Sequence, residues 1–368
     1  MPPNTPETIS EQFKKLDLKK LVREKGLYQV YPQVSYPPLE PFEHVDAGKR
    51  GDPKKASLFD NATEVFDLTP IIGTEIHGLQ LSQLSDQQKN DLALLAAERG
   101  VVFFRNQDLD PYQAVELGKY FGRPHIHNTV GHPEGLPEVI SLFYDEKNPT
   151  LTQYFESKAA ADGWHSDITY ENQPAGISIL KIDTSPESGG DTMWASAYEA
   201  YDRLSPPFQK FVEGLSAVHT GQIHTENAKR TGTFIRREFV DSVHPVVRTH
   251  PVTGWKGLFV QPGFTKSIVG LSTRESKLLL DHLYEHVSGG HNFQVRFKWE
   301  EDSVAIWDNR STFHTAIFDY FSVGRRHGWR VTPTAERPYF DPESKSRRQD
   351  LAEKAAAAAA AVAKKDSA

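Results

Sequence analysis

Two histidines and one aspartate have the residue types and spacing of a metal centre. His165 and Asp167 are two positions apart, so both side chains can face inward at a strand end, where side chains repeat with period two. His314, far along the chain, would complete one face of a coordination sphere. Two imidazoles and one carboxylate with the opposite face open are the arrangement of non-haem Fe(II) oxygenases. Arg326 and Arg330 follow His314, and a guanidinium fork suits the carboxylate of a cosubstrate.

Other histidines are also possible metal ligands, because the chain contains 15 histidines. The competing pairs are His125 with His127, His132 with Glu134, and His224 with Glu226. Any one of these histidines could instead be a surface residue or a hydrogen-bonded core residue. A Gly-Trp turn before His165, and a distant histidine followed by arginines, favour the first set. A zinc hydrolase is a further alternative, although no carboxylate stands out as its general base.

Composition excludes several classes of protein. The chain of 368 residues contains no cysteine, which excludes disulfides, Cys-ligated zinc, iron–sulfur clusters and thiol nucleophiles. Its formal charge of −7 argues against nucleic acids and anionic membranes as partners. The N-terminus lacks the apolar stretch of a signal peptide, and no apolar run approaches the roughly 18 residues of a membrane span. We therefore expect a cytoplasmic protein, and a homo-oligomer stays open.

The elements that must position these residues are mostly short strands. Capping signals predict helices beginning after Ser85, Asp110, Ser205 and Ser272, and a buried strand at 101–104. Further strands are expected at 177–182, 192–195, 246–249, 258–261, 293–297 and 304–307. Many short strands joined by Gly/Pro turns predict a mainly β protein, a double-stranded β-helix (jelly roll) core with helical decoration.

Three regions are expected along the chain. Residues 1–60 are rich in Pro, Lys and Glu and read as a partly irregular N-terminal arm without a core of its own. Residues 61–340 have compact alternation and form the globular domain. Residues 341–368 are charged and then alanine-rich, which indicates an exposed terminal helix or a frayed tail.

Six blocks of the chain resemble the TauD/TfdA family of Fe(II)- and 2-oxoglutarate-dependent dioxygenases. They occur in the family's order at 101–107, 121–127, 164–170, 188–194, 244–251 and 306–310. The similarity extends from about residue 66 to about residue 338 and leaves out the arm and the tail. The resemblance implies His165, Asp167 and His314 as ligands of Fe(II). It also implies Thr192 and Arg326 as the grip on 2-oxoglutarate, with a register that the neighbouring Arg325 could shift by one.

The same resemblance suggests where a substrate would bind. In the family, a histidine and an arginine hold a sulfonate, and the matching positions are His127 and Arg330. Ile168, Tyr170 and Phe264 match other pocket positions. Two departures, Val130 for an aromatic and Ala161 for a polar residue, predict a wider pocket that is less selective for an amine.

The function expected is oxidation of a taurine-like organosulfonate to an aldehyde and sulfite, with succinate and CO2, as the resemblance to fungal sulfonate dioxygenases also implies. The alternative within the same fold is hydroxylation of another small anion, such as a sulfate ester, an aryloxyacetate or a secondary metabolite. A binding or sensing module that does not turn over is the alternative from another class. Intact ligand positions argue against it.

Overall fold

A seven-stranded sheet forms the centre of the fold. The computed structural model describes residues 29–144, 159–320 and 323–366. The strand order is β2-β3-β4-β16-β8-β18-β7, with β3 parallel to β4 and the other neighbours antiparallel. The strands are β2 (Glu64–Asp67), β3 (Thr74–His77), β4 (Val101–Phe104), β16 (Ser303–Asp308), β8 (Ile177–Thr184), β18 (Arg326–Val331) and β7 (Val139–Tyr144).

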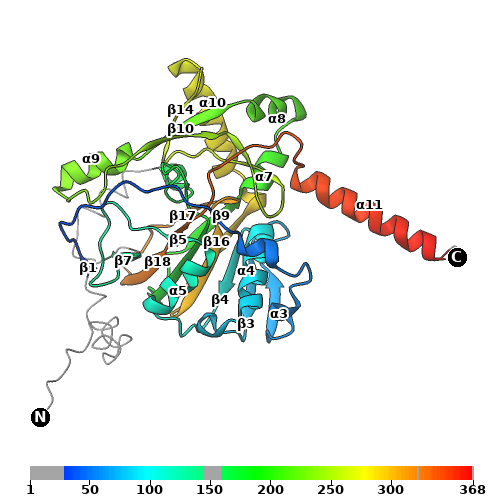
Figure 1. Ribbon diagram of the computed structural model, residues 1–368, viewed down its shortest axis with the longest axis horizontal. Helices are drawn as coiled ribbons and strands as arrows, with labels where there is room; N and C mark the ends of the chain where they lie inside the picture. Colours follow the sequence, from blue (N-terminus) through cyan, green and yellow to red (C-terminus); the bar gives the residue numbers. More distant parts are fainter. Residues whose placement is uncertain (1–28, 145–158, 321–322, 367–368) are drawn as a thin grey trace, which may run out of the picture.

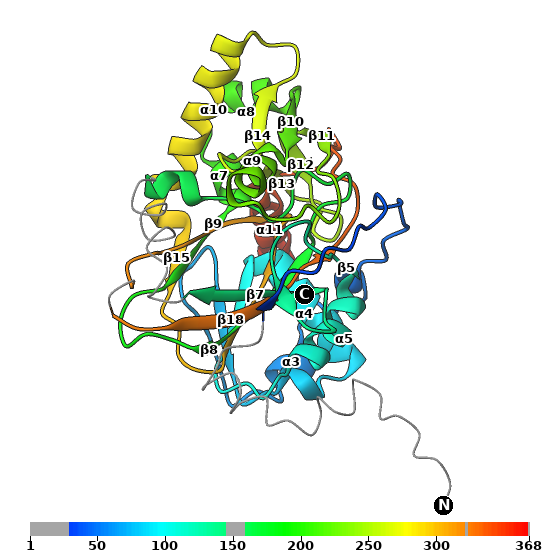
Figure 2. The same ribbon diagram turned by 90° about the vertical axis from the view of Figure 1, so that its left-hand side faces the viewer.

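A smaller sheet packs on one face of the large one (Figure 2). It has the order β15-β9-β17, with β15 (Gln294–Phe297), β9 (Thr192–Ser196) and β17 (Thr312–Ala316). Trp194 of β9 and Trp307 of β16 meet in the apolar layer between the sheets, with their ring centroids 5.8 Å apart. Phe103 and Phe297 stack there at 4.0 Å. The two sheets form the jelly-roll core that the strand pattern predicted.

Helices α4 (Asp86–Arg99) and α5 (Pro111–Phe121) cover the other face of the large sheet (Figure 1). Both begin as their sequences predicted, because Ser85 and Asp110 close capping boxes at their N-termini. Leu92 and Leu117 bring the apolar sides of the two helices into a common core with Trp329 of β18. Strand β18, which carries Arg326 and Arg330, is therefore supported by these two helices on one face of the large sheet.

A second layer encloses the far side of the small sheet. It contains α7 (Ala197–Asp202), α8 (Pro206–Glu213), α9 (Gln222–Thr231), α10 (Thr273–Ser288), the sheet of β11 (Asp241–Pro245), β10 (Ser216–Thr220) and β14 (Thr265–Ile268), and the hairpin of β12 (Val247–Thr249) and β13 (Lys256–Leu258). The predicted strand at 258–261 is wrong beyond Leu258. Residues 261–265 instead form a turn, in which the amide of Thr265 donates to the carbonyl of Gln261 at 3.1 Å.

The N-terminal arm is attached to the domain at several points. Its strand β1 (Gln29–Val30) pairs with β6 (His132–Pro133), and Leu58 of α3 (Ala56–Phe59) is fully buried in the main core. The remaining short elements are η1 (Ala47–Arg50), η2 (Leu81–Gln83), η3 (Ala160–Gly163), η4 (His291–Phe293), β5 (Arg123–Pro124) and β19 (Pro333–Thr334).

The alanine-rich tail forms the exposed helix α11 (Arg347–Asp366), which projects from the body (Figure 1). Its first turn is anchored where the indole Nε1 of Trp255 donates to Asp350 at 2.8 Å. None of the helices in the described ranges combines the length and hydrophobicity that a membrane crossing requires.

Candidate metal and cosubstrate centre

His165, Asp167 and His314 converge at one point beside the small sheet. Oδ1 of Asp167 lies 3.8 Å from Nε2 of His165 and 3.6 Å from Nε2 of His314. Two donors that bind one ion at about 2.1 Å can be at most about 4.2 Å apart, so both separations suit a shared ion. All three donor atoms lie within 4.8 Å of one another. Two neutral nitrogens and one carboxylate oxygen form a donor set that fits Fe(II).

The two histidines are joined directly through their main chains. His165 and His314 form an isolated antiparallel bridge in which each amide donates to the other's carbonyl, at 2.9 and 2.7 Å. The ring of His165 is oriented by Nδ1, which lies 2.8 Å from the carbonyl of Gly163. That contact places the ring proton on Nδ1 and leaves Nε2 with its lone pair for a metal. The two histidines are therefore fixed by an isolated bridge, whereas the sequence predicted that His165 and Asp167 lie at a strand end.

Asp167 lies in a turn and is held by two polar neighbours. Its amide donates to Oδ1 of Asn309 at 3.0 Å, and its Oδ2 accepts from the hydroxyl of Ser178 at 2.9 Å. Asn309 is itself fixed, because its amide nitrogen donates to Oγ of Ser178 at 2.9 Å. The next residue, Ile168, has φ of 45°, a left-handed conformation that is strained for a β-branched side chain.

Asn309 and Ser178 are supporting residues that the sequence did not identify. Asn309 belongs to the block at 306–310, so the signal was present in the chain. Ser178 is buried inside β8 and has no sequence signal of its own. Their contacts with Asp167 depend on the pairing of β8 with β16, which places Ser178 opposite Trp307.

The electrostatic environment keeps Asp167 and His314 in metal-binding protonation states. Burial opposes ionisation of Asp167, but Arg330 and the two imidazoles outweigh it and lower the pKa of its carboxyl. Burial lowers the pKa of His314 well below its ordinary value, and the neighbouring His165 acts in the same direction. An ionised Asp167 beside a neutral His314 is the state that binds a divalent cation.

Arg330 contacts the candidate metal ligand directly. Its Nη1 lies 2.8 Å from Oδ1 of Asp167, the oxygen that faces both histidines. It lies on β18, two residues from Gly328 and four from Arg326, so the alternation of side chains along the strand places all three on one face. A substitution at Arg330 would therefore affect the metal ligand as well as any substrate.

Arg326 and Thr192 meet in a second buried site. Nε of Arg326 donates to the carbonyl of Gly190 at 3.0 Å, and Nη2 donates to Oγ1 of Thr192 at 3.4 Å. The hydroxyl of Thr192 also accepts from Nε1 of Trp299 at 2.9 Å. Within the described ranges no carboxylate lies within ion-pairing distance of Arg326, although its side chain is buried. The neighbouring Arg325 is exposed, with its guanidinium 5.3 Å from the Phe143 ring.

The predicted substrate residues lie on the neighbouring segments. His127 is buried, and its Nδ1 accepts hydrogen bonds from the amides of Thr129 at 3.2 Å and Val130 at 3.1 Å. The ring proton is therefore on Nε2, and burial, followed by the nearby His224, lowers the pKa of His127 well below its ordinary value. His127 is a neutral hydrogen-bond donor. Ala161 is exposed on η3, the short helix that precedes His165.

A group of aromatic side chains lies beside His127 and His165. Tyr170 packs at 5.2 Å against Phe264, whose ring lies 6.4 Å from that of His165. The Tyr170 hydroxyl is buried without a hydrogen-bond partner among the described residues. His224 completes the group, with its ring 5.2 Å from His127 and 5.4 Å from Phe264. The sequence offered His224 only as half of a competing pair with Glu226, and it did not predict this location.

A cavity of about 520 Å³ opens beside His165. Its lining is mainly apolar and combines the segment after His314 with residues from α9 and from the turn at 261–265. The lining residues are Ala159, Asp162, Gly163, His165, Ile223, His224, Asn227, Gly263, Phe264, Thr315, Ala316, Ile317, Phe318 and Asp319. Such a cavity can hold the organic part of a small molecule next to the metal ligands.

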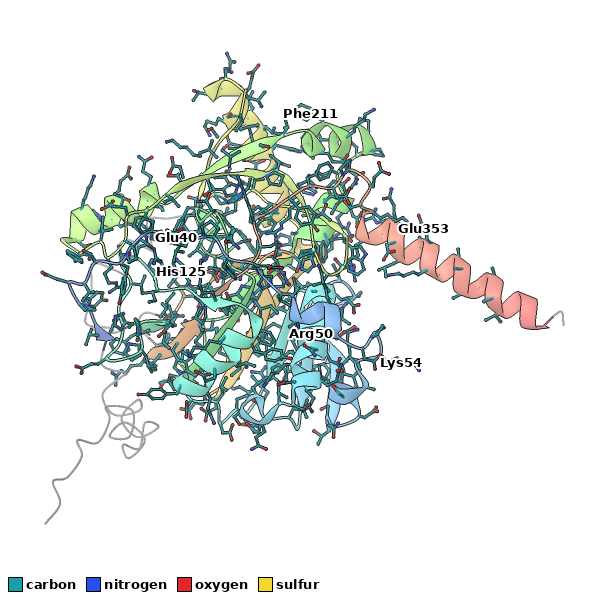
Figure 3. All side chains as sticks on the ribbon, in the orientation of Figure 1. Glu40, Arg50, Lys54, His125, Phe211 and Glu353 are labelled. Atoms are coloured by element: carbon teal, nitrogen blue, oxygen red, sulfur yellow. The ribbon has the colours of Figure 1, made fainter. Side chains whose placement is uncertain are left out.

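The competing histidines have other roles. His125, labelled in Figure 3, is buried, and its Nε2 lies 3.0 Å from Oε1 of Glu171. Nδ1 of His132 contacts the carbonyl of Pro133 at 2.8 Å. Neither belongs to a group of metal-binding side chains in the part of the chain that the structure describes.

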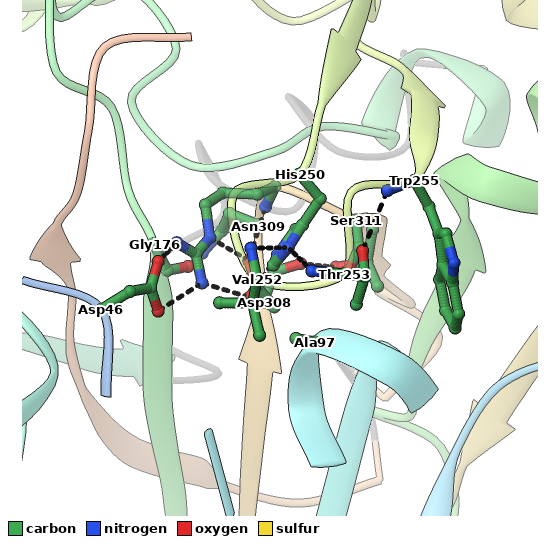
Figure 4. Close-up of polar contacts among 12 residues, drawn as sticks. Asp46, Ala97, Gly176, His250, Val252, Thr253, Trp255, Asp308, Asn309 and Ser311 are labelled. Carbon is green, nitrogen blue, oxygen red and sulfur yellow. Dashed lines mark hydrogen bonds and ion pairs between the residues drawn. The ribbon is translucent and has the colours of Figure 1, made fainter. Parts of the chain in front are cut away.

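A second group of possible metal ligands, His44, Asp46 and Glu336, is already occupied by a guanidinium. Arg310 pairs with both of these carboxylates and with Asp308, at 2.7 Å in the last case. Figure 4 shows Asp46, His250 and Asp308 in this buried network. It connects the N-terminal arm to the end of β16, the strand that precedes Asn309.

Comparison with known proteins shows the family that the chain matches. The family described as taurine catabolism dioxygenase TauD, TfdA family matches residues 64–332. An alpha-ketoglutarate-dependent sulfonate dioxygenase of Saccharomyces cerevisiae is 41% identical over 338 residues, which cover 89% of this chain and 82% of that protein. An alpha-ketoglutarate-dependent dioxygenase of Penicillium expansum is 40% identical over 82% of this chain and 85% of its own. The crystal structure of a taurine dioxygenase from Burkholderia xenovorans has a TM-score of 0.64 and 36% identity, covering 76% of this chain and 93% of that one.

Proposed function

This chain belongs to the TauD/TfdA family of 2-oxoglutarate-dependent iron dioxygenases, and from that premise we propose that its substrate is an organosulfonate. In this proposal His165, Asp167 and His314 hold Fe(II), Thr192 and Arg326 hold 2-oxoglutarate, and His127 and Arg330 hold the sulfonate. When bound, the iron supplies oxidation by dioxygen, coupled to conversion of 2-oxoglutarate into succinate and CO2. The products would be an aldehyde and sulfite.

The charges of the centre carry this proposal. Counted over the metal ligands, the two arginines and the cosubstrate alone, without Asp162 and Asp319 at the cavity, Fe(II) with Asp167 contributes +1, Arg326 and Arg330 contribute +2, and 2-oxoglutarate contributes −2, which leaves +1. A buried site with one uncompensated positive charge favours a monoanion. Arg330 now shares its carboxylate partner with two imidazoles, and the same oxygen would also serve the metal. A substrate anion would give the guanidinium of Arg330 an anionic partner that it does not share with the metal.

The neighbouring groups support a strong acid in particular. His127 is neutral and presents Nε2–H, so it offers one hydrogen bond without requiring a proton from the ligand. Arg330 stays charged at every physiological pH, as a sulfonate does. The apolar cavity beside His165 would receive the carbon chain and exclude water from it. Ile168, Tyr170 and Phe264 would hold that chain in place, which fixes the C–H bond that reacts.

A matched panel of substrates tests the proposal. Wild-type protein with Fe(II), 2-oxoglutarate and an alkanesulfonate should form succinate and release sulfite in equal amounts. The carboxylate and the sulfate ester of the same chain length serve as controls. Turnover of the carboxylate or the sulfate ester with no sulfite from any sulfonate would keep the dioxygenase and reject the sulfonate. We further propose that the protein works in the cytoplasm on a small molecule, with no nucleic-acid or membrane partner.

A further inference from the structure

We propose that Arg236 is a positioning residue, which holds the segment 126–130 so that His127 presents its Nε2–H to the substrate anion. The N-terminal arm holds Arg236 from the other side. This inference rests on the proposed function, because it concerns a residue assigned there to the substrate. It also gives a role to the arm, which lies outside the matched range 64–332.

Arg236 binds the main chain around His127 and is buried, with 2% of its surface exposed. Its Nη2 donates to the carbonyl of His127 at 2.9 Å and also to the carbonyl of Val130. Within the described ranges no carboxylate lies within ion-pairing distance of this guanidinium. Burying a cation without an anion is costly, so carbonyl binding is the compensation that the fold provides.

Segments 126–130 and 236–237 each donate hydrogen bonds to the other, and we call this set of hydrogen bonds the clamp. The amide of Arg236 donates to the carbonyl of Asn128 at 2.8 Å, and Nδ2 of Asn128 donates to the carbonyl of Arg237 at 2.7 Å. Nη2 of Arg237 in turn donates to the carbonyl of Ile126 at 2.6 Å. Two consecutive arginines thus bind the segment on both sides of His127.

The carbonyls of His127 and Val130, which Arg236 binds, lie on either side of the two amides that hold the imidazole of His127. Thr129 and Val130 donate to Nδ1 of His127, so the turn that Arg236 stabilises also sets the tautomer of the ring. If the turn opens, Nδ1 loses its donors and the proton is no longer confined to Nε2. The hydrogen bond offered to the anion would then be lost in part of the molecules.

The N-terminal arm covers this clamp. The amide of Tyr36 donates to the carbonyl of Arg236 at 2.6 Å. Earlier in the arm, Val30 pairs with His132, and Nε2 of Gln29 donates to the carbonyl of Ser141 at 3.3 Å. Residues 29–36 therefore join the segment after His127 to the segment that carries Arg236.

The test compares Arg236→Met with Arg99→Met. Arg99 is a control, because its guanidinium donates to the carbonyls of Thr69, Pro70 and Gly73 in another part of the fold, and unlike Arg236 it also pairs with Asp67 at 3.3 Å. Two quantities are measured in each variant: the KM values from sulfite and succinate formation, and hydrogen exchange of the Thr129 and Val130 amides without substrate.

We expect Arg236→Met to raise the KM for the sulfonate about two- to tenfold, since the hydrogen bond from His127 to the anion is displaced or lost in part of the molecules. The KM for 2-oxoglutarate should change less than about twofold, and the two amides should lose protection. Arg236→Lys should restore part of both effects. Arg99→Met should lower the melting temperature without either effect.

The arm is tested separately at Tyr36. Tyr36→Pro removes the amide donor and should raise the sulfonate KM, whereas Tyr36→Ala keeps the donor and should not. If Arg236→Met does not fold, Arg236→Lys and the Tyr36 pair decide the question. Unchanged exchange of both amides in these variants would overturn the inference, as would an equal KM increase in Arg99→Met. Absence of sulfite from the wild type would instead overturn the proposed function, because amide exchange is measured without substrate.

Discussion

Replacing Arg326 by Gln should weaken binding of 2-oxoglutarate strongly and specifically. The guanidinium is buried, donates to Thr192 and to the carbonyl of Gly190, and has no carboxylate partner among the described residues. A hydrogen bond to a charged group contributes about 1.5–3 kcal/mol, so its loss should raise the dissociation constant roughly 10- to 150-fold. Folding should not suffer by a similar amount, because the variant removes a buried cation whose pKa is already lowered by burial.

The control for this prediction is the adjacent arginine. Arg325→Gln changes an exposed side chain that contacts the Phe143 ring, so 2-oxoglutarate affinity should stay within about twofold of the wild type. Affinity is measured by anaerobic titration of the Fe(II) protein with 2-oxoglutarate, and stability by urea unfolding of the metal-free protein. The reasoning is refuted if Arg325→Gln gives the loss and Arg326→Gln does not, since the cosubstrate fork would then be one residue away.

Three further predictions concern the supports of the site. Asn309→Ala should weaken Fe(II) binding about 10- to 100-fold, because Asp167 loses its orienting partner, and metal titration against Ser166→Ala as control would detect it. Gly328→Ala should destabilise the fold by about 1–3 kcal/mol in urea, because its Cβ would lie 2.2 Å from a backbone carbonyl oxygen of β8, whereas Gly214→Ala meets its nearest atom at 3.9 Å and should be nearly neutral. Burial lowers the pKa of His244 to about 4, below the unfolded value near 6.5, so the unfolded chain binds this proton more tightly and stability falls as the pH drops from about 6.5 to 4. Between pH 7 and pH 5 this group should account for a loss of about 2 kcal/mol in EDTA, and an undiminished loss in His244→Gln would contradict it.

The sequence predicted the parts of the site whose residues are chemically distinctive. His165, Asp167 and His314 could be selected because few combinations of ligand types and downstream arginines occur in the chain. The capping boxes at Ser85 and Asp110 located two helices, because capping depends on residues three positions apart. Such local chemistry can be read directly from the chain.

Long-range contacts between ordinary residues could not be predicted in this way. Ser178 contacts Asp167 only because β8 and β16 pair in one register. The local sequence around a serine in an apolar strand does not indicate such a contact. His224 reaches the pocket through the packing of α9 against Phe264. The strand predicted at 258–261 ended early, because the turn at 261–265 satisfies its backbone through Thr265 and draws the chain away from β12.

The projecting helix α11 gives this enzyme a convenient point of chemical attachment. Val362 is 59% exposed near its far end, and the chain contains no cysteine that would compete for a thiol reagent. A helix rises about 1.5 Å per residue, so Val362→Cys would place a dye or a surface linker roughly 20 Å beyond Arg347. A single labelled species would follow from one substitution. Immobilised or fluorescent protein of this kind could report binding of 2-oxoglutarate and of the substrate without altering any residue of the centre.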